Sequence, residues 1–208
     1  MKKILVYGDS NVWGDNFLTG KRIPYDKQWV NILKNKLKDK YMFFQEGLPG
    51  RIAGGEETLK KYKNGKDTFV STYRSNAPID ILIIALGTND LQIKYNKSSD
   101  TIINDLLWYK ETLEKSFTDI DDQKKYFNNK MPKIIYILPI NFDYKNKASI
   151  IFDSSSERKR QEIISYFENH NLKNIYSNNM ELLDDGIHLN FEGHEHMANL
   201  VMEVINHD

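Results

Sequence analysis

The 208-residue chain is predicted to fold as an α/β protein, a three-layer α/β/α sandwich around a parallel sheet of about five strands. Short apolar runs alternate along the chain with longer segments in which apolar residues recur at helical spacing. One run, residues 79–86, is apolar at nearly every position, which is typical of a central parallel strand buried on both faces. The length suits one domain comprising residues 1–208.

The first half of the chain alternates between the two kinds of segment. Short apolar runs predict strands at residues 3–7, 42–45 and 79–86. Apolar residues spaced by three and four predict helices at residues 27–40, 66–74 and, on a weaker pattern, 55–62. Pro78 ends the helix expected at residues 66–74 before the central strand begins.

The second half opens with the clearest helix, residues 98–117, which Ser98 or Ser99 can cap. Further apolar runs predict strands at residues 133–138 and 172–176, and helical spacing predicts helices within 149–169 and at 190–206. The polar segment 119–130 is expected to be an exposed loop. The irregular segment 141–156 follows a strand and is a candidate wall of a substrate pocket.

Composition excludes several classes of function. Lys and Arg total 29, as do Asp and Glu, so the formal net charge is zero and no nucleic-acid partner is expected. The absence of cysteine excludes disulfides, thiolate catalysis and cysteine-ligated metals. No apolar stretch is long enough to span a membrane, and the run at residues 4–7 is too short for a signal peptide. We therefore expect a cytoplasmic protein.

Four polar segments follow predicted strands and supply the parts of an acyl-transfer site. They are Gly8-Asp9-Ser10-Asn11, Gly47-Leu48-Pro49-Gly50-Arg51, Gly87-Thr88-Asn89-Asp90 and Asp185-Gly186-Ile187-His188. Because ligands of parallel sheets bind outside the carboxyl ends of the strands, these segments are expected to meet at one edge. Taken singly, each is an ordinary turn or cap.

The residue types in these segments fit nucleophilic catalysis. Ser10 needs a base to remove its proton, and His188 can serve as that base. Asp185, three residues earlier, can reach Nδ1 of the imidazole and leave Nε2 free to face the serine. Gly50 has no side chain to block an approaching acyl group, and the Asn89 amide can donate to an oxyanion.

In order and spacing, these segments resemble the sequence blocks of the SGNH hydrolases, also called the GDSL-type esterase/lipase family, over nearly the whole chain. The resemblance implies a flavodoxin-like SGNH hydrolase fold, with Ser10 as nucleophile, His188 as base and Asp185 as its orienting acid. It also implies an oxyanion hole formed by Ser10, Gly50 and Asn89. The expected reaction needs neither a cofactor nor a metal. The Trp13-Gly14 pair and the segments 46–48 and 75–80 are most similar to the arylesterase or acetylesterase branch.

The chain departs from the family at Asn11, where the first block usually continues with leucine or isoleucine. We expect Asn11 to cap the following helix, the alternative being a polar contact in the pocket. The Gly-x-Ser-x-Gly elbow of α/β-hydrolases is missing from the sequence, so that superfamily is a poor match.

Other polar residues have ordinary structural interpretations. Asp9 and Asp90 are expected to hold their loops through backbone hydrogen bonds. For Arg51 we expect a structural ion pair, the alternative being contact with a substrate carboxylate or phosphate. His194 is expected to pack within its helix. A metal face formed by His188, Glu192 and His196 is disfavoured, because the expected helix cap Asn190 follows His188.

The predicted activity is hydrolysis of small carboxylic esters through an acyl-serine. Short acyl chains are favoured, since no long apolar lid segment is visible. Two alternatives remain, an acyltransferase of the same fold and a non-catalytic protein that binds a small ligand. A nucleotide-binding flavodoxin-like protein is less favoured, because no phosphate-binding glycine motif follows the first strand. A homo-oligomer is compatible with the sequence.

Overall fold

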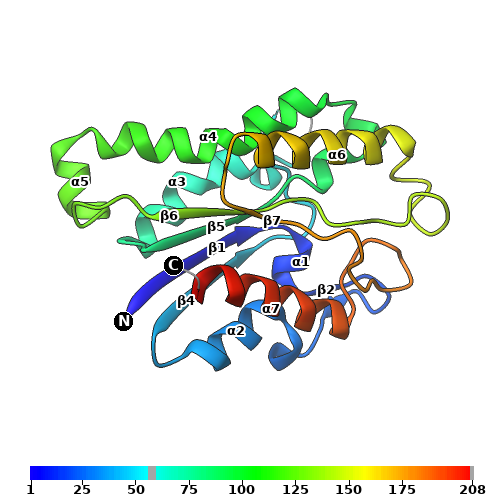
Figure 1. Ribbon diagram of the computed structural model, residues 1–208, viewed down its shortest axis with the longest axis horizontal. Coiled ribbons are helices and arrows are strands. Elements are labelled where there is room, and N and C mark those ends of the chain that lie inside the picture. Colours follow the sequence, from blue (N-terminus) through cyan, green and yellow to red (C-terminus); the bar gives the residue numbers. More distant parts are fainter. Residues whose placement is uncertain (56–59, 207–208) are drawn as a thin grey trace.

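The computed structural model describes residues 1–55 and 60–206 and contains a five-stranded, fully parallel sheet (Figure 1). The strand order is β4-β1-β5-β6-β7. The strands are β1 (Lys2–Gly8), β4 (Tyr41–Gly47), β5 (Ile81–Ala85), β6 (Lys133–Ile137) and β7 (Asn174–Ile175). The predicted α/β fold class with about five parallel strands is therefore confirmed.

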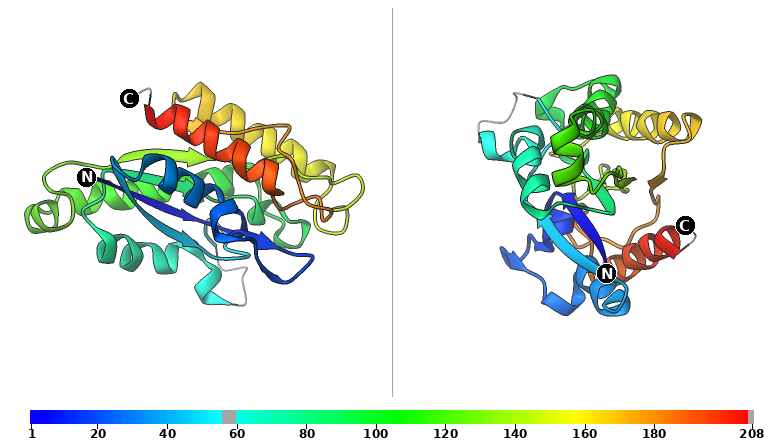
Figure 2. Two further views of the ribbon diagram at one scale, coloured as in Figure 1. Left: turned by 90° about the horizontal axis from the view of Figure 1, so that it is seen from below. Right: turned by 90° about the vertical axis from the view of Figure 1, so that its left-hand side faces the viewer.

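Helices cover both faces of this sheet, as Figures 1 and 2 show. On one face lie α3 (Gly65–Asn76), α4 (Ser99–Phe117) and α6 (Ser154–Asn169), and on the other α1 (Ser10–Trp13), α2 (Trp29–Leu37) and α7 (Phe191–Asn206). The two-residue period of a strand places successive side chains on opposite faces, which explains why residues 4–7 of β1, buried on both faces, are all apolar. Its Leu5 and Tyr7 pack on the α3/α4 side, whereas Ile4 and Val6 pack on the α2/α7 side.

Two predictions about secondary structure need correction or qualification. The segment 119–130, expected to be a loop, contains α5 (Ile120–Tyr126), whose N-cap Asp119 accepts hydrogen bonds from the backbone N–H groups of Asp121 and Asp122. This helix buries no residue and therefore has no apolar stripe to reveal it. The helix expected at 55–62 lies largely outside the described residues, and its end is a single 3₁₀ turn, Lys61–Lys63.

The remaining short elements join these layers. They are the antiparallel pair β2 (Asp15–Asn16) and β3 (Lys21–Arg22), and the 3₁₀ turns Tyr25–Lys27, Asn89–Leu91 and Ile93–Tyr95. No helix within residues 1–55 and 60–206 is long and apolar enough to cross a membrane.

The sheet register brings three of the polar segments to one edge. Gly8, at the carboxyl end of β1, pairs with Gly47 on one side and Ala85 on the other. At Gly47 a Cβ would lie 2.3 Å from the backbone nitrogen of Trp13, so glycine is needed for α1 to sit directly on the end of β4. The residues that follow β4 and β5 therefore start one strand spacing to either side of those that follow β1.

Candidate active site

Three side chains from opposite ends of the chain form one hydrogen-bonded line. Ser10 is the first residue of α1, directly after Asp9 and the end of β1. Its Oγ lies 3.0 Å from Nε2 of His188, and Nδ1 of His188 lies 2.5 Å from Oδ2 of Asp185. The other Asp185 oxygen accepts the backbone N–H groups of Ile187 and His188, at 2.9 and 3.0 Å. The turn therefore fixes the carboxylate that orients the imidazole.

The charges of these groups suit a base held by an acid. Burial raises the pKa of Asp185, but hydrogen bonds from His188 and the backbone outweigh burial and leave that pKa below its ordinary value. Burial lowers the pKa of His188. The hydrogen bond to Asp185 and the negative charges of Asp185, Asp15 and Asp9 raise it by more, so the pKa lies above its ordinary value of 6.5. An ionised Asp185 thus stabilises the imidazolium form of His188.

Asn11 does not cap α1, and our expectation for it was wrong. The cap is Asp9, whose Oδ1 accepts the backbone N–H of Asn11 at 3.0 Å. The Asn11 side chain reaches across the site instead, and its Oδ1 accepts the backbone N–H of Leu189 at 2.9 Å. This contact joins the residue after Ser10 to the residue after His188. Leucine or isoleucine could not accept such a bond.

Hydrogen-bond donors lie on the loops after β4 and β5. Gly50 has a φ of 74°, a conformation that favours glycine. Its N–H and that of Ser10 donate to no acceptor within the described part of the chain. The Asn89 amide donates to the backbone carbonyl of Arg51 at 3.1 Å and accepts from Gln92 at 2.8 Å. These bonds fix the orientation of the Asn89 amide and leave it a second N–H.

Arg51 is held differently from our expectation. It is buried, and its guanidinium lies 4.1 Å from the centroid of the Tyr7 ring. The guanidinium donates to the backbone carbonyls of Gly8 and Glu46 at 2.9 and 2.5 Å. Among the described residues it forms no ion pair, so the predicted pairing was wrong. Arg51 instead ties the end of β1 to the end of β4.

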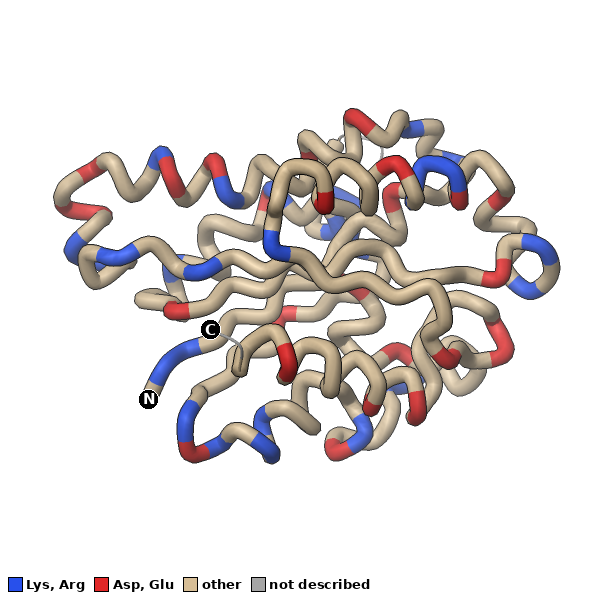
Figure 3. Tube along the Cα trace, viewed as in Figure 1, with Lys and Arg blue, Asp and Glu red and all other residues tan. Residues whose placement is uncertain are grey.

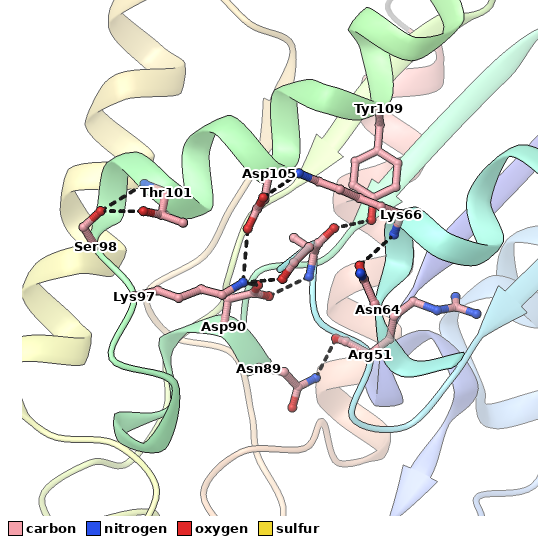
Figure 4. A network of polar contacts seen from close by, with 12 residues as sticks. Arg51, Asn64, Lys66, Asn89, Asp90, Lys97, Ser98, Thr101, Asp105 and Tyr109 are labelled. Carbon is pink, nitrogen blue, oxygen red and sulfur yellow. Dashed lines mark hydrogen bonds and ion pairs between the residues drawn. The ribbon is translucent and has the colours of Figure 1, made fainter. Parts of the chain in front are cut away.

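A buried ionic network holds the loop that follows Arg51 (Figure 4). Asp90 accepts the backbone N–H of Ala53 at 2.8 Å, and its other oxygen pairs with Lys97 Nζ at 2.8 Å. Lys97 also pairs with Asp105 at 3.1 Å and donates to the carbonyl of Gly54. Asp90 thus bonds the backbone as expected, and so does Asp9. Lys97 escaped the sequence analysis because its segment reads as a charged surface.

Comparison with known proteins places the chain in a family. A family model described as GDSL-like Lipase/Acylhydrolase matches residues 4–201. The chain belongs to the GDSL-like lipase/acylhydrolase family. A search of curated proteins finds no match. Membership in this family, together with the serine site, makes the protein a carboxylic ester hydrolase.

Solved structures share the fold of this GDSL-like hydrolase. A carbohydrate acetylesterase family member from Sinorhizobium meliloti is 19% identical with a TM-score of 0.79, over 100% of this chain and 98% of that one. The M. smegmatis aryl esterase is 20% identical with a TM-score of 0.77, over 98% and 100% of the two chains. The lipase/acylhydrolase from Enterococcus faecalis is 17% identical with a TM-score of 0.68, over 100% and 96%.

The sequence analysis missed a hairpin that this GDSL-like hydrolase places beside the serine. Strands β2 and β3 have two residues each, too few to show periodicity. Oδ2 of Asp15 lies 3.9 Å from Nε2 of His188. The Phe17 ring stacks on the imidazole with 6.5 Å between centroids and an interplanar angle of 8°. The hairpin therefore adds a charge and an aromatic ring to the site.

The two histidines of α7, His194 and His196, contact residues away from Ser10. His194 is buried and accepts the backbone N–H of Trp29 at 3.3 Å, and burial lowers its pKa to about 4. His194 therefore stays neutral at physiological pH. His196 lies 3.2 Å from a carboxylate oxygen of Glu181. Across residues 1–55 and 60–206, no cluster of three or more potential ligands is arranged to hold a metal ion.

Proposed function

We propose that residues 1–208 form one domain that hydrolyses esters of short acyl chains, such as acetyl esters, through an acyl-serine intermediate. The observation that carries this proposal is the line from Ser10 Oγ to His188 Nε2, at 3.0 Å, and on to Asp185. The choice of short acyl groups is supported by the names of two proteins of similar fold, a carbohydrate acetylesterase family member and an aryl esterase.

In the proposed acylation step, Ser10 Oγ bonds to the ester carbonyl carbon while its proton passes to Nε2 of His188. The Ser10 and Gly50 backbone N–H groups and the Asn89 amide stabilise the negative charge on the carbonyl oxygen. The bond to the alkoxy oxygen then breaks, and Nε2 returns the proton to the leaving alcohol. Asp185 stays ionised and holds the imidazolium in place.

Deacylation repeats these steps with water in place of serine. A water molecule gives a proton to Nε2 of His188 as its oxygen attacks the acyl carbon. The bond to Ser10 Oγ breaks, and Oγ takes the proton back from Nε2. The products are a carboxylic acid and free enzyme.

The acyl preference and the acceptor are tested together by product analysis. Acetate, butyrate and octanoate esters of 4-nitrophenol are incubated with the enzyme, with and without 1-propanol. Free acid as the main product, formed fastest from the acetate, supports the proposal. Propyl ester as the main product would identify an acyltransferase. Fastest turnover of the octanoate would contradict the acyl preference.

Asn89→Ala should lower kcat by about 10²- to 10³-fold, because it removes one oxyanion donor whose effect is felt mainly in the transition state. KM should change much less. Steady-state kinetics with 4-nitrophenyl acetate measure both constants, and thermal unfolding checks that the variant is folded. A loss below about tenfold in a folded variant would contradict the assignment of Asn89.

The pH dependence of kcat/KM should report the protonation of the catalytic base, His188. A protonated His188 cannot accept the Ser10 proton, so kcat/KM should fall as the pH is lowered through an apparent pKa above 6.5. Asp185→Asn removes the charge that raises this pKa, so its acid limb should move to lower pH and its maximum rate should drop. An activity that stays constant down to pH 5 would exclude His188 as the base.

A further inference from the structure

The site holds a second carboxylate, that of Asp15, which the reaction steps above do not use. Its Oδ2 lies 3.9 Å from Nε2 of His188, the atom that handles the proton. The Asp15 side chain is 20% exposed, compared with 7% for Asp185 on the other side of the imidazole. Asp185 therefore acts on the imidazole from the protein interior, whereas Asp15 also faces solvent and whatever approaches Nε2.

The position of Asp15 is fixed at the base of the hairpin. In the β2–β3 register Asp15 pairs with Arg22, and the N–H of Ile23 donates to the carbonyl of Gly14 at 2.8 Å. The Arg22 guanidinium lies 4.7 Å from the centroid of the Trp13 ring, and its Nε donates to the Trp13 carbonyl at 2.8 Å. Figure 2 shows the hairpin, in blue, projecting at the end of the molecule away from the N-terminus.

Among the described residues, the carboxylate of Asp15 has no permanently charged counterion within 4 Å. Within the described residues, the one basic group within 4 Å of its carboxylate is the His188 imidazole, which is charged only when protonated. Figure 3 shows further acidic positions along this end of the trace. A cation lies at the oxyanion loop instead, where Lys63 Nζ is 2.7 Å from the position that a Cβ on Gly50 would take. The His188 side of Ser10 therefore carries the negative charge of Asp15, and the Gly50 side carries the positive charge of Lys63.

Proton delivery determines which part of the substrate meets Asp15. His188 Nε2 must come within about 3 Å of the alkoxy oxygen to protonate it. That oxygen therefore lies within roughly 7 Å of the Asp15 carboxylate, on the side of the leaving alcohol. The Phe17 ring, 67% exposed and stacked on the imidazole, offers an aromatic face at the same place.

We propose that Asp15 selects the leaving alcohol by charge, so that the enzyme accepts neutral or cationic alcohols and disfavours alcohols with a carboxylate or phosphate near the ester oxygen. This inference rests on the proposed function, because only a leaving group protonated by His188 must lie beside Asp15. If the charge on the alcohol lies about as far from Asp15 as the ester oxygen does, roughly 7 Å, then in a partly hydrated site it changes the rate by about 3- to 50-fold.

Three acetate esters that differ only in the meta substituent of the phenol test the proposal. They are methyl 3-acetoxybenzoate (neutral), 3-acetoxybenzoate (anionic) and 3-acetoxy-N,N,N-trimethylanilinium (cationic), each corrected for its rate of hydrolysis by hydroxide. Wild type should prefer the cationic ester and discriminate against the anionic one. In Asp15→Asn the anionic-to-neutral ratio of kcat/KM should rise about fivefold or more, and the cationic-to-neutral ratio should fall. These ratios do not depend on the fraction of active enzyme.

Two controls separate a local charge from net charge. Asp39→Asn removes the same charge from the turn before β4, at the amino ends of the strands and away from the site. It should leave both ratios unchanged. Added salt should reduce the preference of wild type and leave Asp15→Asn almost unaffected. Unchanged ratios in Asp15→Asn, with hydrolysis still dependent on Ser10, would overturn the role of Asp15 alone. Hydrolysis by Ser10→Ala at a rate close to that of wild type would overturn the proposed function itself.

Discussion

Replacing Ser10 with alanine should lower the rate of ester hydrolysis by at least about 10⁴-fold, because the variant has no oxygen that can form the acyl-enzyme. His188 and the oxyanion donors remain in place, so a small rate above that of buffer should persist. The measurement is release of 4-nitrophenol from the acetate and butyrate esters by matched amounts of wild type and variant.

The same variant should keep its fold. Ser10 Oγ hydrogen-bonds to His188, and replacing this small hydroxyl leaves no large cavity. Circular dichroism and thermal unfolding should therefore resemble those of wild type. Equal hydrolysis by the two folded proteins would contradict the role of Ser10 as nucleophile.

Lys97→Met should lower the free energy of unfolding by about 3–5 kcal/mol, because it leaves a carboxylate buried without its counterion. The side chains of Lys97 and Asp90 are 1% and 0% exposed. Asp105 keeps a partner in Lys66 at 2.6 Å, whereas Asp90 loses its one ion pair among the described residues. Urea unfolding at pH 8 measures the loss.

The loss should shrink at lower pH. Burial already raises the pKa of Asp90, and Lys97 opposes that effect. Without Lys97 the pKa in the folded state rises further above its value in the unfolded chain, so stability decreases as Asp90 ionises with rising pH. Unfolding at pH 5 should therefore show a smaller difference from wild type. Lys94→Met, which alters an exposed lysine nearby, is the control. Equal stability of Lys97→Met and this control would contradict the account of the network.

Regular patterns were enough to predict most of the fold. Apolar runs predicted the five strands of the sheet, most clearly the inner strands β1, β5 and β6, because a central parallel strand is buried on both faces. Helices that pack one face on the sheet were predicted from apolar residues that recur at helical spacing. Helix α5 was missed because it buries no residue, and the β2–β3 hairpin because two-residue strands have no period.

The same distinction applies to the site. Ser10, Asp185 and His188 were predicted as partners from residue type and from the strands they follow, and the structure brings them within hydrogen-bond distance. Contacts that depend on tertiary packing had no local pattern. The bond from Asn11 to Leu189 spans 178 positions, and the buried position of Lys97 depends on α4 and on the loop at Gly54.

The activated serine is tested most directly by covalent labelling. The folded protein is treated with a fluorophosphonate, and the adduct is located by mass spectrometry of peptides. We predict one adduct per chain, on Ser10, that forms much more slowly in His188→Ala. A folded, unlabelled wild type, or an adduct on another residue, would contradict the claim that His188 activates Ser10.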